Sequence, residues 1–290
     1  MGARVIDGVA IAEKVKAQVA EAVAAMKPRV PKLVALMVGD NPGARAYAKS
    51  QGKACEEVGI AYELRELPET ISEADLIREI TALNSDPEVT AVLLTMPVPP
   101  HLDGRAAQRL IDPLKDADGV HPVNLGGVVQ GRRQLAPCTA LAVMEILESA
   151  EVPLKGAEVV MVGHSEIVGK PTALLLLEQL ATVTVCHIGT VDLAAHTRRA
   201  EILIVAVGKP GLITADMVRP GAVVVDVGIN RVMDPETGKS RIVGDVDYGP
   251  VSEIASAITP VPGGVGAVTT AMLLRNVVEA ATLQETLKRI

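Results

Sequence analysis

The sequence predicts an α/β fold with parallel sheets. Short apolar runs alternate along the chain with segments whose apolar residues recur at helical spacing. In the second half, four of these runs are almost uninterrupted: 157–162, 182–186, 201–207 and 222–227. Strands of that kind are buried on both faces, as in a doubly wound parallel sheet. A length of 290 residues is enough for two domains of ordinary size.

The first half predicts three strands separated by helices. Residues 8–27 place an apolar residue every four positions, which indicates a helix that ends before Pro28. Ser72 followed by Asp75 resembles a capping box and opens another helix. The other expected elements are strands at 33–38, 60–67 and 89–94, a helix at 44–58 and a loop at roughly 112–136.

The second half predicts helices between and after its four strands. They are expected at 139–150, 172–180 and 266–288. The polar segment 229–246 predicts a hairpin, with its turn at 234–238.

The chain is poor in aromatic residues and acidic overall. It has no Trp, no Phe and only three Tyr, at positions 47, 62 and 248. The core must therefore consist of Ala, Val, Leu, Ile and Met, and base stacking on aromatic platforms is disfavoured. The net charge of −7 also disfavours a general nucleic-acid binder and a basic membrane-surface protein.

Cysteine spacing and hydropathy indicate a protein of a reducing compartment. Cys55, Cys138 and Cys186 form no metal-ligand or disulfide pattern, so we expect no metal site. No apolar stretch approaches the roughly 18 residues that span a bilayer. The N-terminus reads as an amphipathic helix and not as a signal peptide. A cytoplasmic location is therefore expected.

A glycine turn follows the strand at 157–162 and leads into a helix. Strand, glycine turn and helix together place a phosphate on backbone N–H groups. Gly163 permits the turn, Ser165 stands where a second glycine is usual, and Gly169 allows helix and strand to approach. A plain strand-to-helix turn is the alternative. Residues 186–190 have neither the acid typical of an NAD site nor the Arg typical of an NADP site.

Several segments recur in a characteristic order and spacing. They are VGDNP (38–42), LLTMPVP (93–99), KDADGVHP (115–122), GHSEIVGKP (163–171), VAVGKPG (205–211), VDVGINR (225–231) and TPVPGGVG (259–266). The set resembles the methylenetetrahydrofolate dehydrogenase/cyclohydrolase family and covers essentially the whole chain.

The resemblance implies two α/β domains with a cleft between them, the second of Rossmann type. Residues 1–140 with 266–290 would bind folate, and residues 141–265 would bind the nicotinamide cofactor, which is NADP, with NAD as the alternative. It also implies a cytoplasmic homodimer. The implied activity is oxidation of 5,10-methylenetetrahydrofolate to the 5,10-methenyl form, which many members then hydrolyse to 10-formyltetrahydrofolate.

The resemblance also assigns site residues. The implied catalytic residues are Tyr47, Gln51, Thr95 and Asp118; Tyr47, Asp118, Pro262, Gly263 and Gly266 would bind substrate, and Gly163, His164, Ser165 and Ile229 would line the cofactor. A carboxylate such as Asp118 can accept hydrogen bonds from the amino group and ring N–H of a pterin.

Two of the departures from the family pattern bear on ring hydrolysis. Gln51 stands where bifunctional members have a Lys four residues after the Tyr, and Thr95 stands where they have a Gln. Gln51 does not titrate, whereas ring hydrolysis needs proton transfers. We therefore predict a dehydrogenase with weak or absent cyclohydrolase activity.

Two alternatives stay open. The first is an ordinary bifunctional enzyme in which Lys53 or a water substitutes for the missing Lys. The second is a folate- or nucleotide-binding protein without catalysis, which the intact glycine segments disfavour.

Overall fold

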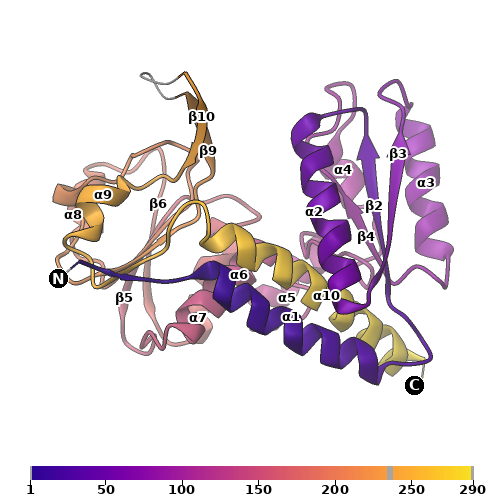
Figure 1. Cartoon of the computed structure of the whole chain (residues 1–290), viewed down its shortest axis with the longest axis horizontal. Coiled ribbons are helices and arrows are strands. Elements are labelled where there is room, and N and C mark those ends of the chain that lie inside the picture. The colour runs from indigo at the N-terminus through magenta and orange to yellow at the C-terminus, as the bar shows by residue number, and fades with distance from the viewer. Residues whose placement is uncertain (1, 234–237, 289–290) are drawn as a thin grey trace. The chain divides into compact units, whose positions relative to one another are not determined.

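The computed structural model describes residues 2–233 and 238–288 and divides into two compact units (Figure 1). The three-stranded unit consists of Glu13–Cys138 and Thr270–Ile290, and the six-stranded unit of Met1–Ala12 and Thr139–Thr269. The boundaries fall within three helices: α1 (Gly8–Ala25), α6 (Cys138–Ser149) and α10 (Val265–Leu287).

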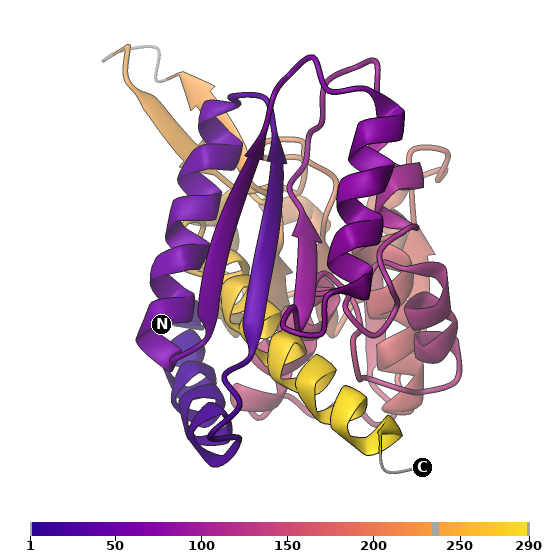
Figure 2. The same cartoon turned by 90° about the vertical axis from the view of Figure 1, so that its right-hand side faces the viewer.

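The three-stranded unit is a parallel sheet covered on both faces. Its strand order is β3 (Ala61–Leu67), β2 (Lys32–Val38), β4 (Ala91–Leu94), with α2 (Pro42–Val58) and α3 (Glu73–Ser85) on opposite sides (Figures 1 and 2). Alternate side chains of β2 pack with α3, because successive residues of a strand point to opposite faces. The central strand β2 is therefore buried along almost its whole length.

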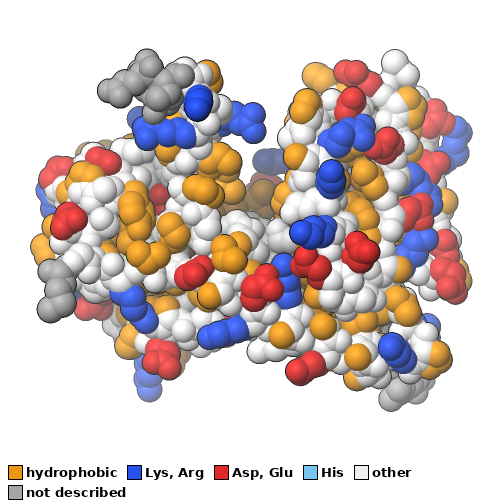
Figure 3. Space-filling model, in the orientation of Figure 1, with side chains coloured by type: hydrophobic (Ala, Val, Ile, Leu, Met, Phe, Trp, Pro, Cys, Tyr) orange, Lys and Arg blue, Asp and Glu red, His pale blue; other side chains and the backbone are white. Residues whose placement is uncertain are grey.

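The ends of α2 and α3 follow their sequence signals. Asn41 accepts a hydrogen bond from the Ala44 N–H at the start of α2, and Gly59 ends that helix with a φ of 81°. Ser72 accepts from the Asp75 N–H, as its capping pattern predicts. Acidic and basic side chains both occur over the visible face of this unit (Figure 3).

The expected loop at 112–136 is wrong, because it contains helix α5 (Pro122–Val129). His121 caps this helix through its ring Nδ1, which accepts from the Val123 N–H, and Pro122 occupies the first turn, where it loses no hydrogen bond. The proline and glycines of this segment predict a loop, although they lie in a short helix. A second short helix, α4 (Gly104–Gln108), has no counterpart in the sequence-based prediction.

The six-stranded unit is a parallel sheet, as the apolar runs predict. Its order is β1 (Arg4–Val5), β11 (Ala257–Ile258), β8 (Val223–Asp226), β7 (Ile202–Val205), β5 (Glu158–Val162), β6 (Thr182–Cys186). The expectation that β6 is buried on both faces is wrong: it is an edge strand, and Thr182 and Val185 are exposed. The helical segments of this unit are α7 (Gly169–Glu178), α8 (Leu193–Thr197), η1 (Ala215–Met217), α9 (Tyr248–Ser252) and most of α6.

A hairpin extends from the six-stranded unit where the polar segment predicts one. Strands β9 (Asn230–Met233) and β10 (Ser240–Val243) pair in antiparallel fashion. Most of the predicted turn, residues 234–237, lies outside the described residues.

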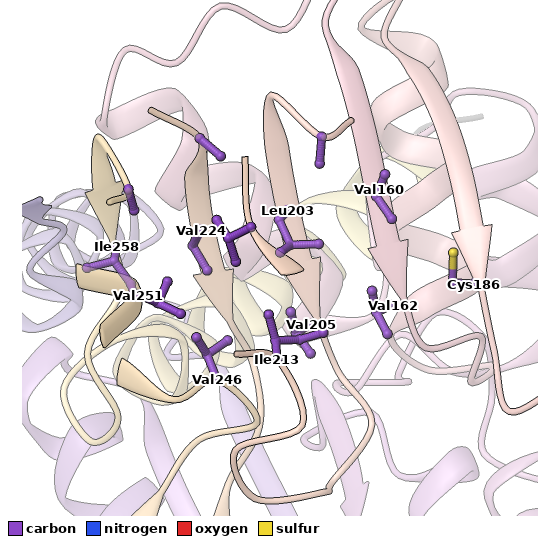
Figure 4. Close-up of a cluster of buried hydrophobic side chains, with 14 residues drawn as sticks. Val160, Val162, Cys186, Leu203, Val205, Ile213, Val224, Val246, Val251 and Ile258 are labelled. Atoms are coloured by element: carbon purple, nitrogen blue, oxygen red, sulfur yellow. The ribbon is translucent and has the colours of Figure 1, made fainter. Parts of the chain in front are cut away.

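The core of the six-stranded unit is aliphatic, as the composition requires. Figure 4 shows Val160, Leu203, Val224 and Ile258 projecting from adjacent strands into one cluster. Ile213 and Val251 close the cluster from the segments that follow the strands. No helix in the described ranges is long and apolar enough to cross a membrane.

The first twelve residues pack with the six-stranded unit, whereas the sequence-based boundary places them with residues 13–140. Strand β1 pairs with β11, and the Arg4 guanidinium donates to the Ala150 carbonyl at 2.8 Å. A two-residue strand is too short to show periodicity, so the sequence carries no signal for this pairing.

Truncation of a core side chain tests this packing. Leu203→Ala leaves a cavity in the fully buried cluster and is expected to lower the free energy of unfolding by about 2–5 kcal/mol. Leu177→Ala is the matched control, because Leu177 is 49% exposed on α7. Urea denaturation measures both, and equal losses would contradict the assigned core.

Candidate functional site

The six-stranded unit has a pocket beyond the carboxyl ends of β5, β6 and β7. Its volume is about 580 Å³. This edge of a parallel sheet is where doubly wound folds bind ligands. The polar lining comes from Gly163, His164, Ser165, His187, Thr190 and Lys209. The structure thus brings together three of the four residues predicted to line the cofactor.

The glycine turn at the start of α7 is closely packed. A Cβ on Gly163 would lie 2.2 Å from the Ala206 carbonyl oxygen, and its φ is 120°. The Ser165 hydroxyl accepts hydrogen bonds from the N–H groups of Val168 and Gly169 at 3.2 and 3.4 Å. Ser165 therefore holds the turn and keeps its own hydrogen for a ligand.

The charge of the lining suits an anion. Lys209 is basic, the rings of His164 and His187 lie with centroids 5.1 Å apart, and none of the described lining residues is acidic. An acid at the end of the second strand would repel a ribose phosphate, and this chain has His187 and Ile188 there.

Ile229 lies elsewhere, in a smaller pocket of about 170 Å³ in the same unit. This pocket also contains Pro262, Gly263 and Gly266, which were predicted to bind substrate. A Cβ on Gly264 would lie 2.4 Å from the Pro260 carbonyl oxygen. Glycine is therefore required for the loop to fold back on itself.

The three-stranded unit places Asp118 in a loop organised by Asp116. The Asp116 carboxylate is buried and accepts from the N–H groups of Gly119 and His121 and from the side chain of Asn124. Burial raises the pKa of Asp118 to about 6, and the nearby negative charge of Asp116 adds to the rise.

Tyr47 extends from α2 toward Asp118. Its side chain is 44% exposed, yet burial around the hydroxyl raises its pKa to about 12, and Cys138 and Asp118 contribute to the rise. The residue is thus partly exposed although its hydroxyl is desolvated. The side chains of Gln51 and Thr270 adjoin the hydroxyl. An exposed aromatic face beside a carboxylate suits a flat, polar-edged ligand.

Gln51 is fully buried, and its amide oxygen and nitrogen have no hydrogen-bond partner within the structure. It lies one helical turn after Tyr47, on the same face of α2. A buried unpaired amide is costly, so Gln51 is a candidate ligand-binding position. Lys53 is 79% exposed and faces Glu57, away from Gln51. This geometry disfavours Lys53 as a substitute.

Thr95 lies at the end of β4, and its hydroxyl is already committed. It donates to the Leu36 carbonyl at 3.0 Å from a buried position. The side chain therefore links β4 to β2, and it has no second hydrogen to give to a ligand.

Asn276 is a site residue that the sequence does not reveal. Its buried amide donates to the carbonyl oxygens of Ala117 and Ala136 at 3.0 Å and contacts the sulfur of Cys138. It thus fastens the Asp118 loop to α10. A polar residue within a mostly apolar helix is the only signal the sequence offers. The three cysteines are free and buried, and among the described residues no cluster of His, Cys, Asp and Glu is placed to hold a metal.

Two family models match successive parts of the chain. The tetrahydrofolate dehydrogenase/cyclohydrolase catalytic domain matches residues 6–118, and the NAD(P)-binding domain of the same family matches residues 137–285.

Individual relatives match over nearly their whole length. The chain is 49% identical to the bifunctional protein FolD of Nautilia profundicola over 279 residues, 96% of each chain. A crystal structure of the bifunctional dehydrogenase/cyclohydrolase FolD of Campylobacter jejuni has a TM-score of 0.91 and 44% identity, and covers 97% of this chain and 99% of that one. The Trypanosoma brucei enzyme, complexed with NADP cofactor and inhibitor, has a TM-score of 0.92 and 38% identity, and covers 98% and 99%.

The raised pKa of Asp118 predicts a stability cost at neutral pH. A carboxyl whose pKa is higher in the folded chain is penalised when ionised, so stability falls as pH rises from about 4 to about 6. Asp118→Asn is expected to raise the free energy of unfolding at pH 7 by about 1–3 kcal/mol and to flatten that pH dependence.

Urea denaturation at several pH values measures the effect. Glu88→Gln is the control, because Glu88 is an exposed carboxylate of the same unit. An Asp118→Asn variant less stable than the parent at pH 7 would contradict the assigned burial cost.

Proposed function

Because the chain belongs to the tetrahydrofolate dehydrogenase/cyclohydrolase family, we propose that it oxidises 5,10-methylenetetrahydrofolate with NADP⁺ and hydrolyses the 5,10-methenyl product to 10-formyltetrahydrofolate. The observation that carries the proposal is the grouping of Asp118, Tyr47 and Gln51 in the three-stranded unit. The six-stranded unit supplies the cofactor pocket.

Asp118 and Tyr47 bind the pterin ring. Above pH 6 the Asp118 carboxylate is ionised and accepts hydrogen bonds from the pterin amino group and ring N–H. The exposed Tyr47 ring stacks on the flat heterocycle while its hydroxyl stays protonated, because its pKa is about 12. The two side chains thereby fix both the plane and the edge of the substrate.

The oxidation needs positioning more than acid–base catalysis. When bound, NADP⁺ supplies the hydride acceptor. The methenyl product is a resonance-stabilised cation, so no protein group has to remove a proton. The contribution of this chain is therefore to orient each ring within its own site: the Gly163 turn shapes the cofactor pocket and the Asp118 loop shapes the folate site.

The lining of the larger pocket supports NADP⁺ over NAD⁺. Lys209, Ser165 and the His164–His187 pair present donors and no carboxylate to a ribose phosphate. The complex of the Trypanosoma brucei enzyme with NADP agrees with this choice.

The relatives support the alternative of a bifunctional enzyme and not the expectation of weak or absent cyclohydrolase activity. Gln51 then serves hydrolysis without titrating. Its amide holds water beside the Tyr47 hydroxyl. That water adds to the methenyl cation and its released proton passes to solvent; the C–N bond at N5 of the ring then breaks, with N5 taking up a proton from solvent, to leave the 10-formyl product. The Lys that the family pattern has at this position would add a titratable group to the same place.

The resemblance further implies a cytoplasmic homodimer, and we include this assembly in the proposal. Exposed apolar side chains follow the open edge strand β6, at Leu180, Val185 and Val191. Such a patch on an unpaired strand edge supports an interface there.

A direct assay tests the proposed oxidation. NADPH absorbance is expected to rise when the protein is mixed with 5,10-methylenetetrahydrofolate and NADP⁺, with a kcat/KM at least about tenfold higher than for NAD⁺. Asp118→Asn is expected to lower kcat/KM for the folate by about 10- to 100-fold, because one of the two accepting oxygens becomes an NH₂ donor and the negative charge is lost. An active Asp118→Asn variant with unchanged KM would refute the pterin assignment.

The role of residue 51 is tested by removing its amide. Gln51→Ala is expected to lower the rate of methenyltetrahydrofolate hydrolysis by roughly 10- to 100-fold while dehydrogenase activity changes by less than about threefold, because the variant loses the group that holds the attacking water. Loss of methenyl absorbance measures the hydrolysis. Lys53→Gln is the control and should leave both rates unchanged, since Lys53 faces Glu57. A large loss of hydrolysis in Lys53→Gln, or no loss in Gln51→Ala, would show that another group performs this step.

A further inference from the structure

One fully buried carboxylate, that of Asp245, gathers four N–H donors. The backbone N–H groups of Val207, Gly208 and Lys209 donate to it at 2.7, 2.9 and 2.8 Å. The side-chain amide of Asn230 donates at 2.8 Å. These partners are 15 to 38 residues away in the sequence, so the carboxylate connects segments that no local turn joins.

Three consecutive backbone N–H groups around one anion form a nest of the kind that binds phosphate in nucleotide sites. Here a carboxylate of the protein itself occupies the nest. Gly208 has a φ of 68°, which lets its N–H turn toward the same oxygen as that of Val207. Asp245 therefore shapes the loop after β7 before any ligand arrives.

The loop that Asp245 holds is a wall of the cofactor pocket. Val207 and Lys209 line the 580 Å³ pocket. The neighbouring Ala206 carbonyl packs so closely on Gly163 that a Cβ there would lie 2.2 Å away. A shift of this loop would move the Lys209 charge and press on the glycine turn.

The hydrogen bond from Asn230 to Asp245 connects this carboxylate to the smaller pocket as well. Asn230 directly follows Ile229, which lines that pocket with the Pro262–Gly263 segment. One carboxylate thus fixes segments that belong to both pockets of the six-stranded unit.

Asp245 is held in turn by Asp226 at the end of β8. The Asp226 carboxylate accepts from the N–H groups of Asp245 and Val246 at 3.0 and 2.9 Å. A Cβ on Gly244 would lie 1.8 Å from an Asp226 oxygen, and one on Gly228 would lie 2.3 Å from the Asp245 carboxyl carbon. This packing leaves the Asp245 side chain a single placement.

We propose that Asp245 is a positioning residue for NADP⁺: it holds the Val207–Lys209 loop in the shape that binds the cofactor. The inference rests on the proposed dehydrogenase function. Without the carboxylate, the loop is ordered only when the cofactor binds, and the free energy of ordering it is subtracted from the binding free energy. Affinity for NADP⁺ therefore falls, while affinity for folate does not.

The test is Asp245→Asn, which replaces one accepting oxygen by an NH₂ group that faces N–H donors. The dissociation constant for NADPH, measured by its fluorescence, is expected to rise at least about tenfold. The KM for NADP⁺ is expected to rise in parallel, with the KM for the folate within about threefold of the parent. The chain has no Trp to interfere with this fluorescence. Asp247→Asn is the matched control, because Asp247 is exposed two residues away and carries the same charge.

The readouts separate the possible failures. A purely structural role would lower the melting temperature but leave the NADPH dissociation constant of the folded fraction within twofold of the parent, and that result overturns the proposal. Where Asp245→Asn does not fold, Asn230→Ala decides: it removes one donor, and a rise of about threefold or more supports the proposal, whereas no change overturns it. If the parent itself neither binds NADPH nor reduces NADP⁺, the proposed function fails instead.

Discussion

Buried carboxylates that accept backbone N–H groups organise the loops at both candidate sites. Asp116 holds the loop that carries Asp118, Asp226 holds the segment after β10, and Asp245 holds the loop after β7. Each lies where a strand or loop turns back, and each would be strongly destabilising without its donors. Several charge-assisted hydrogen bonds per carboxylate offset that desolvation cost.

Such anchors matter more in this chain because its described core consists of aliphatic side chains with some Met and Cys and contains no aromatic ring. Hydrophobic burial is non-directional, so Val, Ile, Leu and Ala pack the sheets without fixing the conformation of the loops beyond them. Hydrogen bonds to the buried carboxylates are directional, and they fix the conformation of these loops. Asp118 has a raised pKa and Gln51 has an unpaired amide, and both carry a local cost in stability.

The sequence predicts most of the regular elements, since their signals are local. The strand at 182–186 matches β6 residue for residue, and Ser72 caps α3 as its spacing indicates. Elements without local periodicity escape it: β1 and β11 have two residues each, and α5 begins at a proline. The edge position of β6 depends on strand order, which hydropathy does not encode.

For the candidate sites, the motifs locate Gly163, Asp118 and Tyr47, and the structure groups the latter two with Gln51. Asn276 and Asp245 escape motif analysis because their partners lie far along the chain, up to 159 residues away for Asn276. Their roles follow from tertiary hydrogen bonds that no spacing rule anticipates. Thr95 is the opposite case: the motif identifies the residue, but it does not reveal that the hydroxyl donates to the Leu36 carbonyl within the sheet.

Amide hydrogen exchange tests the central role of the buried carboxylates most directly. The N–H groups of Val207, Gly208 and Lys209, bound to Asp245, and those of Gly119 and His121, bound to Asp116, are expected to exchange as slowly as the amides of β7 and β2. Exchange of these five amides at the rate of unprotected loops, while the strands stay protected, would contradict the account.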